Sequence, residues 1–259
     1  MNPNYHFESL SDSIKVCVSP EHRFGTDAFL LANFTAPRHK DVVCDLGTGC
    51  GIIPMALAKN YQPKQIVGLD IQQQAIEQFQ LSIERSGLEE NITAIHADLK
   101  DIFRSTEVPL TPHSFDVVTC NPPYKAGNTG ILSELTAEQI ARHEVLCTID
   151  DVCKAAEKLL KYGGRLCLCQ RPERLADVIT AMRNANIEPK RLRFVAKNSS
   201  TAPWLFLIEG KKHSKPFLKV EPLLVVHSED GFSEELLKIY GFDSNENKPI
   251  STKDQEHNQ

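Results

Sequence analysis

The feature that most constrains the fold of this chain is a short apolar run that leads directly into a glycine-rich turn. Residues 42–46 read Val-Val-Cys-Asp-Leu, and Gly47, Gly49 and Gly51 follow at alternate positions before an apolar helical segment that reaches about residue 60. A junction of this kind, from strand to tight turn to helix, points backbone N–H groups at a ligand. It is typical of α/β proteins with a parallel sheet.

The glycine spacing argues against a dinucleotide site. A dinucleotide fingerprint has its third glycine three residues after the second, whereas Ile52 occupies that place here and Gly51 comes one residue early. Asp45 precedes the turn, where a carboxylate suits a cationic ligand better than a pyrophosphate. The ammonium group of S-adenosylmethionine is such a cation. We therefore predict that the turn binds this cofactor through Asp45, Gly47, Gly49 and Gly51.

A second motif, Asn121-Pro122-Pro123-Tyr124, follows an apolar run over residues 115–120. The Asn121 amide oxygen and the Pro122 carbonyl offer two acceptors about one amino group apart, and Tyr124 offers a stacking face. Hydrogen bonds to both protons of a planar amine draw its lone pair out of conjugation and aim it at an electrophilic methyl group, which is preorganised electrostatic catalysis. A rigid turn after a strand also explains the prolines, but the glycine turn upstream favours the catalytic interpretation for all four residues.

Acidic residues follow two further strand-like runs. Asp70 ends a run that begins at Gln65, and a carboxylate there can accept both hydroxyls of a ribose. Asp98 follows the run over residues 92–96 and is placed to accept from an adenine amino group. Lone acids at strand ends often cap helices instead, so the ordered series of motifs carries more weight than either residue. The predicted cofactor site also includes Ile71, Leu99 and Asn121.

Strand and helix patterns alternate along the chain. We expect strands near 42–46, 66–70, 92–96, 115–120, 165–170, 190–197 and 203–209, and helices near 51–60, 72–86, 148–161 and 172–186. Gly163 and Gly164 are expected to end the third of these helices. The order predicts an α/β fold with a doubly wound, mostly parallel sheet of seven strands and a late antiparallel pair, which resembles the Rossmann-like class I methyltransferases. The predicted site residues fall at the carboxyl ends of the strands, where such sheets bind ligands.

Length and composition fit one domain. The 259 residues are 41% hydrophobic, and we expect a single methyltransferase domain over 1–241, with an N-terminal cap segment over 1–40, a core over 41–226 and a disordered tail over 242–259. No run approaches the roughly 20 apolar residues of a membrane span. The first nine residues lack the basic head and apolar core of a secretory signal. These features predict a cytoplasmic protein with no membrane partner.

The eight cysteines do not form a metal-binding pattern. Four of them, Cys44, Cys120, Cys167 and Cys169, fall in apolar strand-like runs, and no CxxC pair is present. The nine histidines are not spaced with them as zinc ligands. We expect reduced, mostly buried thiols and no metal.

The residues before the glycine turn hold a strand candidate over 14–18 and an apolar helix over 29–34. Thr26 or Asp27 is expected to cap that helix. A compatible functional interpretation folds this segment over the methionine end of the cofactor, with Phe24 and Thr26 near the site. Farther on, the insertion between Tyr124 and Cys147 is either a lid that orders on the substrate or a surface loop with a short capped helix.

A net charge of −5 argues against nucleic acid, but the distribution of charge does not. Residues 189–219 contain eight basic residues and one acidic residue, Glu209. We predict that this basic band lies near the site and contacts RNA through Lys190, Arg191, Arg193, Lys197, Lys211 and Lys212. The alternative is a pair of solvated edge strands whose lysines block edge pairing. Trp204 is expected in the core, and a short helix is expected over 233–240.

Taken together, these motifs resemble the bacterial tRNA adenine-N6 methyltransferases that modify adenine 37 beside the anticodon of a valine tRNA. The resemblance covers residues 23–27, 45–51, 121–124, the block Ala141-Arg142-His143-Glu144, and residues 221–223 and 228–231. It implies that the target adenine turns out of the loop, stacks on Tyr124 and presents N6 to Asn121 and the Pro122 carbonyl. It also implies a tRNA partner contacted by Arg142 and His143.

Three other functions remain open at this point. Release-factor N5-glutamine methyltransferases share the tetrad, but they resemble one another in an extra N-terminal helical domain for which this chain leaves no room before Asp45. N2-guanine methyltransferases of rRNA use the same tetrad. A non-catalytic RNA-binding adaptor would keep the fold without methyl transfer.

Overall fold

The computed structural model describes residues 4–20, 22, 24–102, 110–122, 147–229 and 231–241. At its centre lies a sheet in the order β10-β8-β9-β7-β6-β3-β4-β5, and β11 also pairs with β8. The strands are β3 (Val42–Leu46), β4 (Gln65–Asp70), β5 (Ile92–His96), β6 (Phe115–Cys120), β7 (Leu160–Gln170), β8 (Ile187–Ala196), β9 (Leu205–Lys212), β10 (Lys219–Val220) and β11 (Leu224–Val225). All pairings are parallel except those of β9, which runs antiparallel to both of its neighbours. The seven predicted strands are therefore present.

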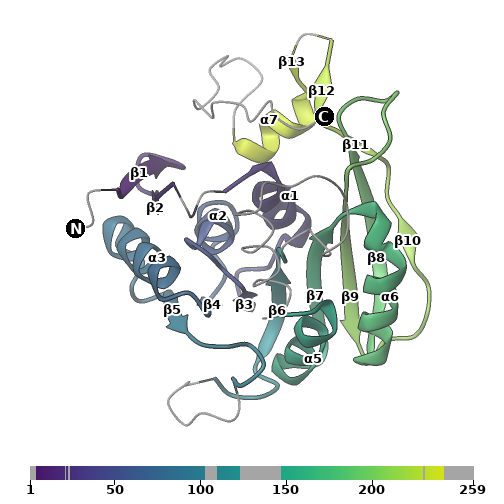
Figure 1. The fold of residues 1–259 in the computed structure, drawn as a ribbon, viewed down its shortest axis with the longest axis horizontal. Coiled ribbons are helices and arrows are strands. Elements are labelled where there is room, and N and C mark those ends of the chain that lie inside the picture. Colours follow the sequence, from purple (N-terminus) through teal and green to yellow (C-terminus); the bar gives the residue numbers. More distant parts are fainter. Residues whose placement is uncertain are drawn as a thin grey trace, which may run out of the picture.

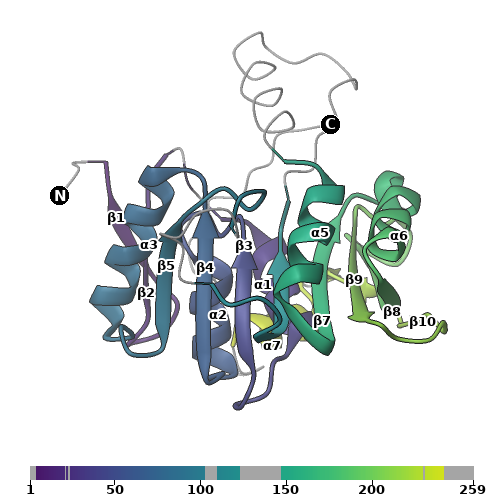
Figure 2. The same ribbon diagram turned by 90° about the horizontal axis from the view of Figure 1, so that it is seen from below.

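Helices cover both faces of the sheet (Figures 1 and 2). One face carries α1 (Thr26–Thr35), α2 (Ile52–Asn60), α3 (Gln73–Ser86) and α7 (Glu234–Tyr240), and the other carries α5 (Ile149–Leu159) and α6 (Leu175–Asn184), which follows the short helix η1 (Pro172–Arg174). Because side chains alternate along a strand, β3 sends Val43 into the first apolar core and Cys44 and Leu46 into the second. The arrangement is the doubly wound α/β fold that was predicted.

Two hairpins flank this core. The first joins β1 (His6–Ser9) to β2 (Lys15–Val18) and packs on α3, where Cys17 N donates to Ser82 Oγ over 2.9 Å. The second joins β12 (His227–Ser228) to β13 (Gly231–Phe232) just before α7. Among the described residues, no helix is long and apolar enough to cross a membrane.

Two local predictions are wrong. Helix α5 ends at Leu159 and the chain enters β7 at Leu160 without a loop, so Gly163 and Gly164 lie inside a strand. The pairing of β6 with β7 shifts register there, between Phe115 and Val117, and a glycine accommodates the irregular backbone. Helix α1 begins at Thr26 after Gly25 and has no side-chain cap. The Thr26 hydroxyl instead hydrogen-bonds the Tyr240 hydroxyl over 2.9 Å and ties α7 to α1.

Two arginines from the sheet bind the C-terminal end of α1. Arg165 Nη1 donates to the Thr35 carbonyl over 3.0 Å, and Arg191 Nη2 donates to the Phe34 carbonyl over 2.9 Å. Both guanidiniums also pair with the Glu209 carboxylate, at 2.8 and 3.3 Å. Because the last turn of α1 has no basic residue of its own, these cations supply the charge that a helix C-terminus favours.

Candidate methyl-transfer site

A cavity of ≈ 300 Å³ lies at the carboxyl ends of β3, β4, β5 and β6. This is the edge of a parallel sheet at which ligands bind. Its walls are Leu46, Gly47, Gly49, Leu69, Asp70, Ile71, Gln72, Ala97, Asp98, Leu99, Cys120, Asn121, Pro122, Cys147 and Val152. Seven of the eleven residues predicted to bind a cofactor are in this set, and four, Phe24, Thr26, Asp45 and Gly51, are not.

The glycine turn forms one wall of the cavity. Gly47, Gly49 and Gly51 have φ values of 67°, 55° and 83°, a backbone region that side chains other than glycine rarely adopt. Gly47 and Gly49 line the cavity, whereas Gly51 lies under it. A Cβ on Gly51 would come within 1.9 Å of the ring of Phe79, so this glycine lets α2 and α3 pack closely.

Asp70 joins two loops of the site. One carboxylate oxygen accepts from Gly49 N over 2.9 Å, and the other accepts from Gln72 N over 2.9 Å. Asp70 is buried yet lines the cavity. Because each carboxylate oxygen has more than one lone pair, these backbone bonds leave acceptor capacity toward the cavity.

Asp45 lies behind the cavity wall. It is fully buried, and one of its oxygens accepts from the Thr119 hydroxyl over 2.6 Å. The other oxygen has no hydrogen-bond partner in the described part of the chain. Burial raises the pKa of this carboxyl to about 7, against the opposing effects of the nearby Thr119 and Thr48 hydroxyls. A buried carboxylate behind the cavity wall, with one oxygen that makes no hydrogen bond to the described residues, fits the positive charge of an ammonium group on the other side of that wall.

The far wall combines one acid with apolar side chains. Asp98 accepts from Lys100 N over 2.9 Å and lines the cavity beside Leu99 and Ile71, a hydrophobic residue that is 38% exposed. An apolar wall with an adjacent acceptor suits a planar heterocycle with an amino group.

Seven residues that line the cavity were not predicted from the sequence, namely Leu46, Leu69, Gln72, Ala97, Cys120, Cys147 and Val152. All but the last two follow or end a predicted strand, which is a usable signal; Cys147 and Val152 enter from beyond the long insertion and give none.

The segment before α1 reaches the site through His22. His22 Nε2 and Gln72 Oε1 lie 3.1 Å apart, so this segment touches a residue that lines the cavity. Phe24 packs edge-to-face on Phe29, with ring centroids 5.7 Å apart. Phe24 and Thr26 therefore contact α1 and α7 in this structure, and their role toward a cofactor stays a prediction.

The tetrad begins in the cavity wall. Asn121 and Pro122 follow β6 directly and line the same cavity as Gly49 and Asp70. Pro123 and Tyr124 lie outside the described residues. So do the proposed lid, Arg142 and His143, and the tail over 242–259.

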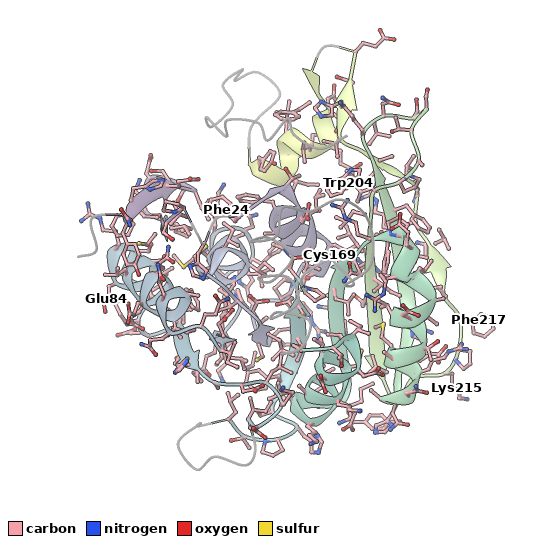
Figure 3. All side chains as sticks on the ribbon, viewed as in Figure 1. Phe24, Glu84, Cys169, Trp204, Lys215 and Phe217 are labelled. Carbon is pink, nitrogen blue, oxygen red and sulfur yellow. The ribbon has the colours of Figure 1, made fainter. Side chains whose placement is uncertain are left out.

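The predicted basic band does not lie together beside this cavity. Since β9 runs antiparallel to β7, Lys211 pairs with Arg165 and Lys212 pairs with Ile187, at the opposite edge of the sheet from the site. Figure 3 likewise shows Lys215 far from Cys169, which lies at the carboxyl end of β7. Lys197 follows the end of β8 and is exposed at the carboxyl edge.

Several members of the band form contacts within the protein. Lys212 is 3% exposed and pairs with Glu157 at 2.9 Å, so the prediction that it contacts RNA is wrong. Arg193 pairs with Glu235 at 2.7 Å. Arg191 is held by Glu209 and Glu221, and Lys190 donates to the carbonyls of residues 215 and 216.

The cysteines form no disulfides. All eight are free thiols. Among the described residues, no group of three or more His, Cys, Asp or Glu side chains is arranged to hold a metal ion.

A doubly wound sheet with a glycine turn after β3, an acid at the end of β4 and an Asn-Pro after β6 defines the class of S-adenosylmethionine-dependent methyltransferases. The chain belongs to a methyltransferase family, since the family model described as a methyltransferase domain matches residues 37–217. The predicted fold and enzyme class are confirmed.

Individual relatives carry more specific names. The tRNA1(Val) (adenine(37)-N6)-methyltransferase of Aliivibrio fischeri is 24% identical, over 92% of this chain and 96% of that protein. The protein of the same name from Yersinia pseudotuberculosis is 32% identical over 56% of this chain, which spans just over half of that relative's length (56%). A solved structure from Agrobacterium tumefaciens, described as a predicted O-methyltransferase, has a TM-score of 0.67 and 21% identity, covering 83% of this chain and 95% of that one. This last likeness establishes the fold.

Proposed function

We propose that this chain transfers a methyl group from S-adenosylmethionine to N6 of an adenine in tRNA, with adenine 37 of a valine tRNA as the target. The observation that carries the proposal is that Asn121 and Pro122 share one cavity with Gly49, Asp70 and Asp98. The names of the relatives from Aliivibrio fischeri and Yersinia pseudotuberculosis support the substrate. A tRNA substrate also supports a cytoplasmic location. A single domain over 1–241 is supported by the apolar core that residues of β2 and α7 share with α1 and α2.

The residues of the cavity fit the cofactor. When bound, S-adenosylmethionine supplies a methyl group on a sulfonium centre. Asp70 offers its remaining lone pairs to the ribose hydroxyls, and Asp98, beside Ile71 and Leu99, accepts from the adenine amino group. Asp45, buried behind the cavity wall, would stabilise the positive charge of the ammonium group without lining the cavity. These assignments give each of the three acids one part of the cofactor.

Asn121 and Pro122 act on the amine that receives the methyl group. Their oxygens accept the two N6 protons, so that the nitrogen lone pair leaves conjugation and becomes nucleophilic. Tyr124 would stack on the adenine ring. No general base is required, because the nitrogen becomes acidic once it is alkylated. A nucleotide in an anticodon loop is also cheaper to extrude than a paired one.

The RNA approaches along the carboxyl edge of the sheet in this proposal. Arg171 follows β7 at that edge, and its guanidinium carbon lies 5.6 Å from the centre of the Trp204 ring. Arg171 Nη1 also donates to the Trp204 carbonyl over 3.1 Å, which fixes an exposed cation beside the site. Together with Lys197, this arginine is placed to meet phosphates that flank the target adenine.

The experiment that tests the proposal uses tRNA that lacks the modification. Purified protein is incubated with labelled S-adenosylmethionine and bulk tRNA from a strain without the gene, and the digested nucleosides are identified by mass. We expect N6-methyladenosine, mapped to position 37 of a valine tRNA. N2-methylguanosine, or label in protein alone, would overturn the assignment and support one of the two competing methyl transfers.

Asn121→Ala tests the role of the amide. By analogy with loss of one oxyanion-hole donor, turnover should fall by about 10²–10³. Calorimetry should show a much smaller loss of cofactor affinity, because Asn121 is one of fifteen residues that line the cavity. Asn184→Ala, at an exposed position on the last turn of α6, is the matched control and should be silent. Near-normal turnover in Asn121→Ala would remove the mechanism.

A further inference from the structure

Cys169 contacts the amide that the proposed mechanism uses. Its Sγ donates to Asn121 Oδ1 over 3.1 Å. Strands β6 and β7 pair in parallel with Cys120 opposite Leu168, so Asn121, which directly follows β6, meets Cys169 of β7 at the carboxyl edge. Cys169 is fully buried, and Figure 3 shows it in the middle of the molecule.

The mechanism requires one orientation of the Asn121 amide. The oxygen and nitrogen ends have nearly the same size, and a half-turn of the amide would direct an NH2 donor at an amine that needs an acceptor. An amide oxygen has two lone pairs, so it can accept from a thiol on one side and from the substrate amine on the other. In the turned orientation, the NH2 group would face the S–H group, which is a poor acceptor.

We infer that Cys169 is a positioning residue whose thiol holds Asn121 in the orientation that presents its oxygen to the substrate amine. This inference rests on the proposed function, because it assigns the work of Asn121 in that reaction. The surroundings suit a thiol: Cys169 belongs to an apolar cluster with Val195, Leu205 and Leu207. A thiol is a weak donor that tolerates apolar neighbours.

Two substitutions separate the hydrogen bond from the packing. Cys169→Ala removes the donor, and Cys169→Ser keeps one at the same place. We expect Cys169→Ala to lower kcat about threefold to tenfold, the effect of one neutral hydrogen bond, with the KM for tRNA and the affinity for the cofactor unchanged. Cys169→Ser should keep kcat within about twofold of the wild type.

Cys167→Ala is the matched control for trimming a buried thiol of β7. Cys167 is fully buried on the same strand, and its Sγ contacts Glu209 at 3.9 Å rather than the cavity. It should leave kcat unchanged. In an Asn121→Ala background, Cys169→Ala should cause no additional loss of turnover, because the amide on which the thiol acts is absent. Equal kcat values for Cys169→Ala and Cys169→Ser, or a loss that persists without Asn121, would overturn the inference.

A second measurement does not depend on turnover. The side-chain amide resonance of Asn121 is assigned by its disappearance in Asn121→Ala, and we expect it to shift in Cys169→Ala and to return in Cys169→Ser. An unshifted resonance in Cys169→Ala contradicts the positioning role. If the wild-type protein forms no N6-methyladenosine in tRNA, the proposed function fails, and this resonance still decides whether the thiol orients the amide.

Discussion

The substitution Gly51→Ala should lower the free energy of unfolding, although Gly51 does not line the cofactor cavity. The new Cβ would lie 1.9 Å from Cδ2 and 2.4 Å from Cε2 of Phe79, which is fully buried between α3 and the sheet and has little room to move. The φ of 83° adds strain. Left-handed backbone costs about 1–2 kcal/mol and overpacking about 1–3 kcal/mol. The free energy of unfolding should therefore fall by about 2–5 kcal/mol, a large share of the stability of a typical domain.

Gly49→Ala is the matched comparison, because it has the strain without the clash. Gly49 has a φ of 55°, and no atom lies within 4 Å of the Cβ that alanine would add. Only the backbone term of about 1–2 kcal/mol applies. Since Gly49 lines the cavity, its new methyl group occupies space that the proposal gives to the cofactor. We expect this variant to lose cofactor affinity more than stability.

Equilibrium unfolding in urea and calorimetric titration with S-adenosylmethionine separate the two effects. Adding Phe79→Leu to Gly51→Ala should recover part of the packing loss and none of the backbone strain. The reasoning is refuted if Gly51→Ala is no less stable than Gly49→Ala, or if Gly49→Ala binds the cofactor as well as the wild type does.

Three further outcomes follow from the structure. Burial raises the pKa of Asp45 to about 7, so the folded state holds a proton that the unfolded chain releases at about pH 4, and Asp45 lowers the stability of the fold as pH rises between these values. Because an ammonium ligand favours the ionised carboxylate, cofactor affinity should rise about tenfold from about pH 6 to about pH 8. In calorimetric titrations, this rise should appear in the wild type and be absent in Asp45→Asn. Arg171→Ala should raise the KM for tRNA and reduce the salt dependence of tRNA binding. Lys211 is exposed at the opposite edge of the sheet, so Lys211→Ala should do neither. Equal effects of the two substitutions in filter-binding and kinetic assays would contradict the proposed RNA path. Glu209→Gln should lower the free energy of unfolding by about 3 kcal/mol, measured in urea, because it leaves Arg165 and Arg191 without their shared carboxylate, and its cofactor affinity should match that of the wild type.

The strands that build the site were predictable because each signal is local. Residues 42–46 and 115–120 are apolar runs that a turn residue follows directly, and the observed strands β3 and β6 match these bounds. The start of β7 was not predictable in this way. Gly163 and Gly164 resemble a helix stop in sequence, but they accommodate a register shift against β6, and such a shift depends on a partner strand more than forty residues earlier in the chain.

The glycine turn shows the same limit at the level of single residues. The sequence assigns Gly47, Gly49 and Gly51 one common role, and all three do have left-handed backbone. Their roles diverge because Phe79, a residue of α3, occupies the space beside Gly51 and leaves the other two open. Asp45 differs from its expected place for a similar reason, since Thr119 on the neighbouring strand binds it behind the cavity wall.

Surface charge is the property that the sequence predicted least well. The eight basic residues between 189 and 219 are close together in the sequence, but β8 and β9 run in opposite directions. Lys197 and Lys211 therefore lie at opposite ends of these strands. Glu157 and Glu235, which pair with Lys212 and Arg193, lie outside that window. A local excess of basic residues therefore does not give the charge of any one surface. The path of an RNA substrate is better inferred from cations that the fold fixes at the carboxyl edge, and Arg171, held over Trp204, meets that condition without belonging to the basic run.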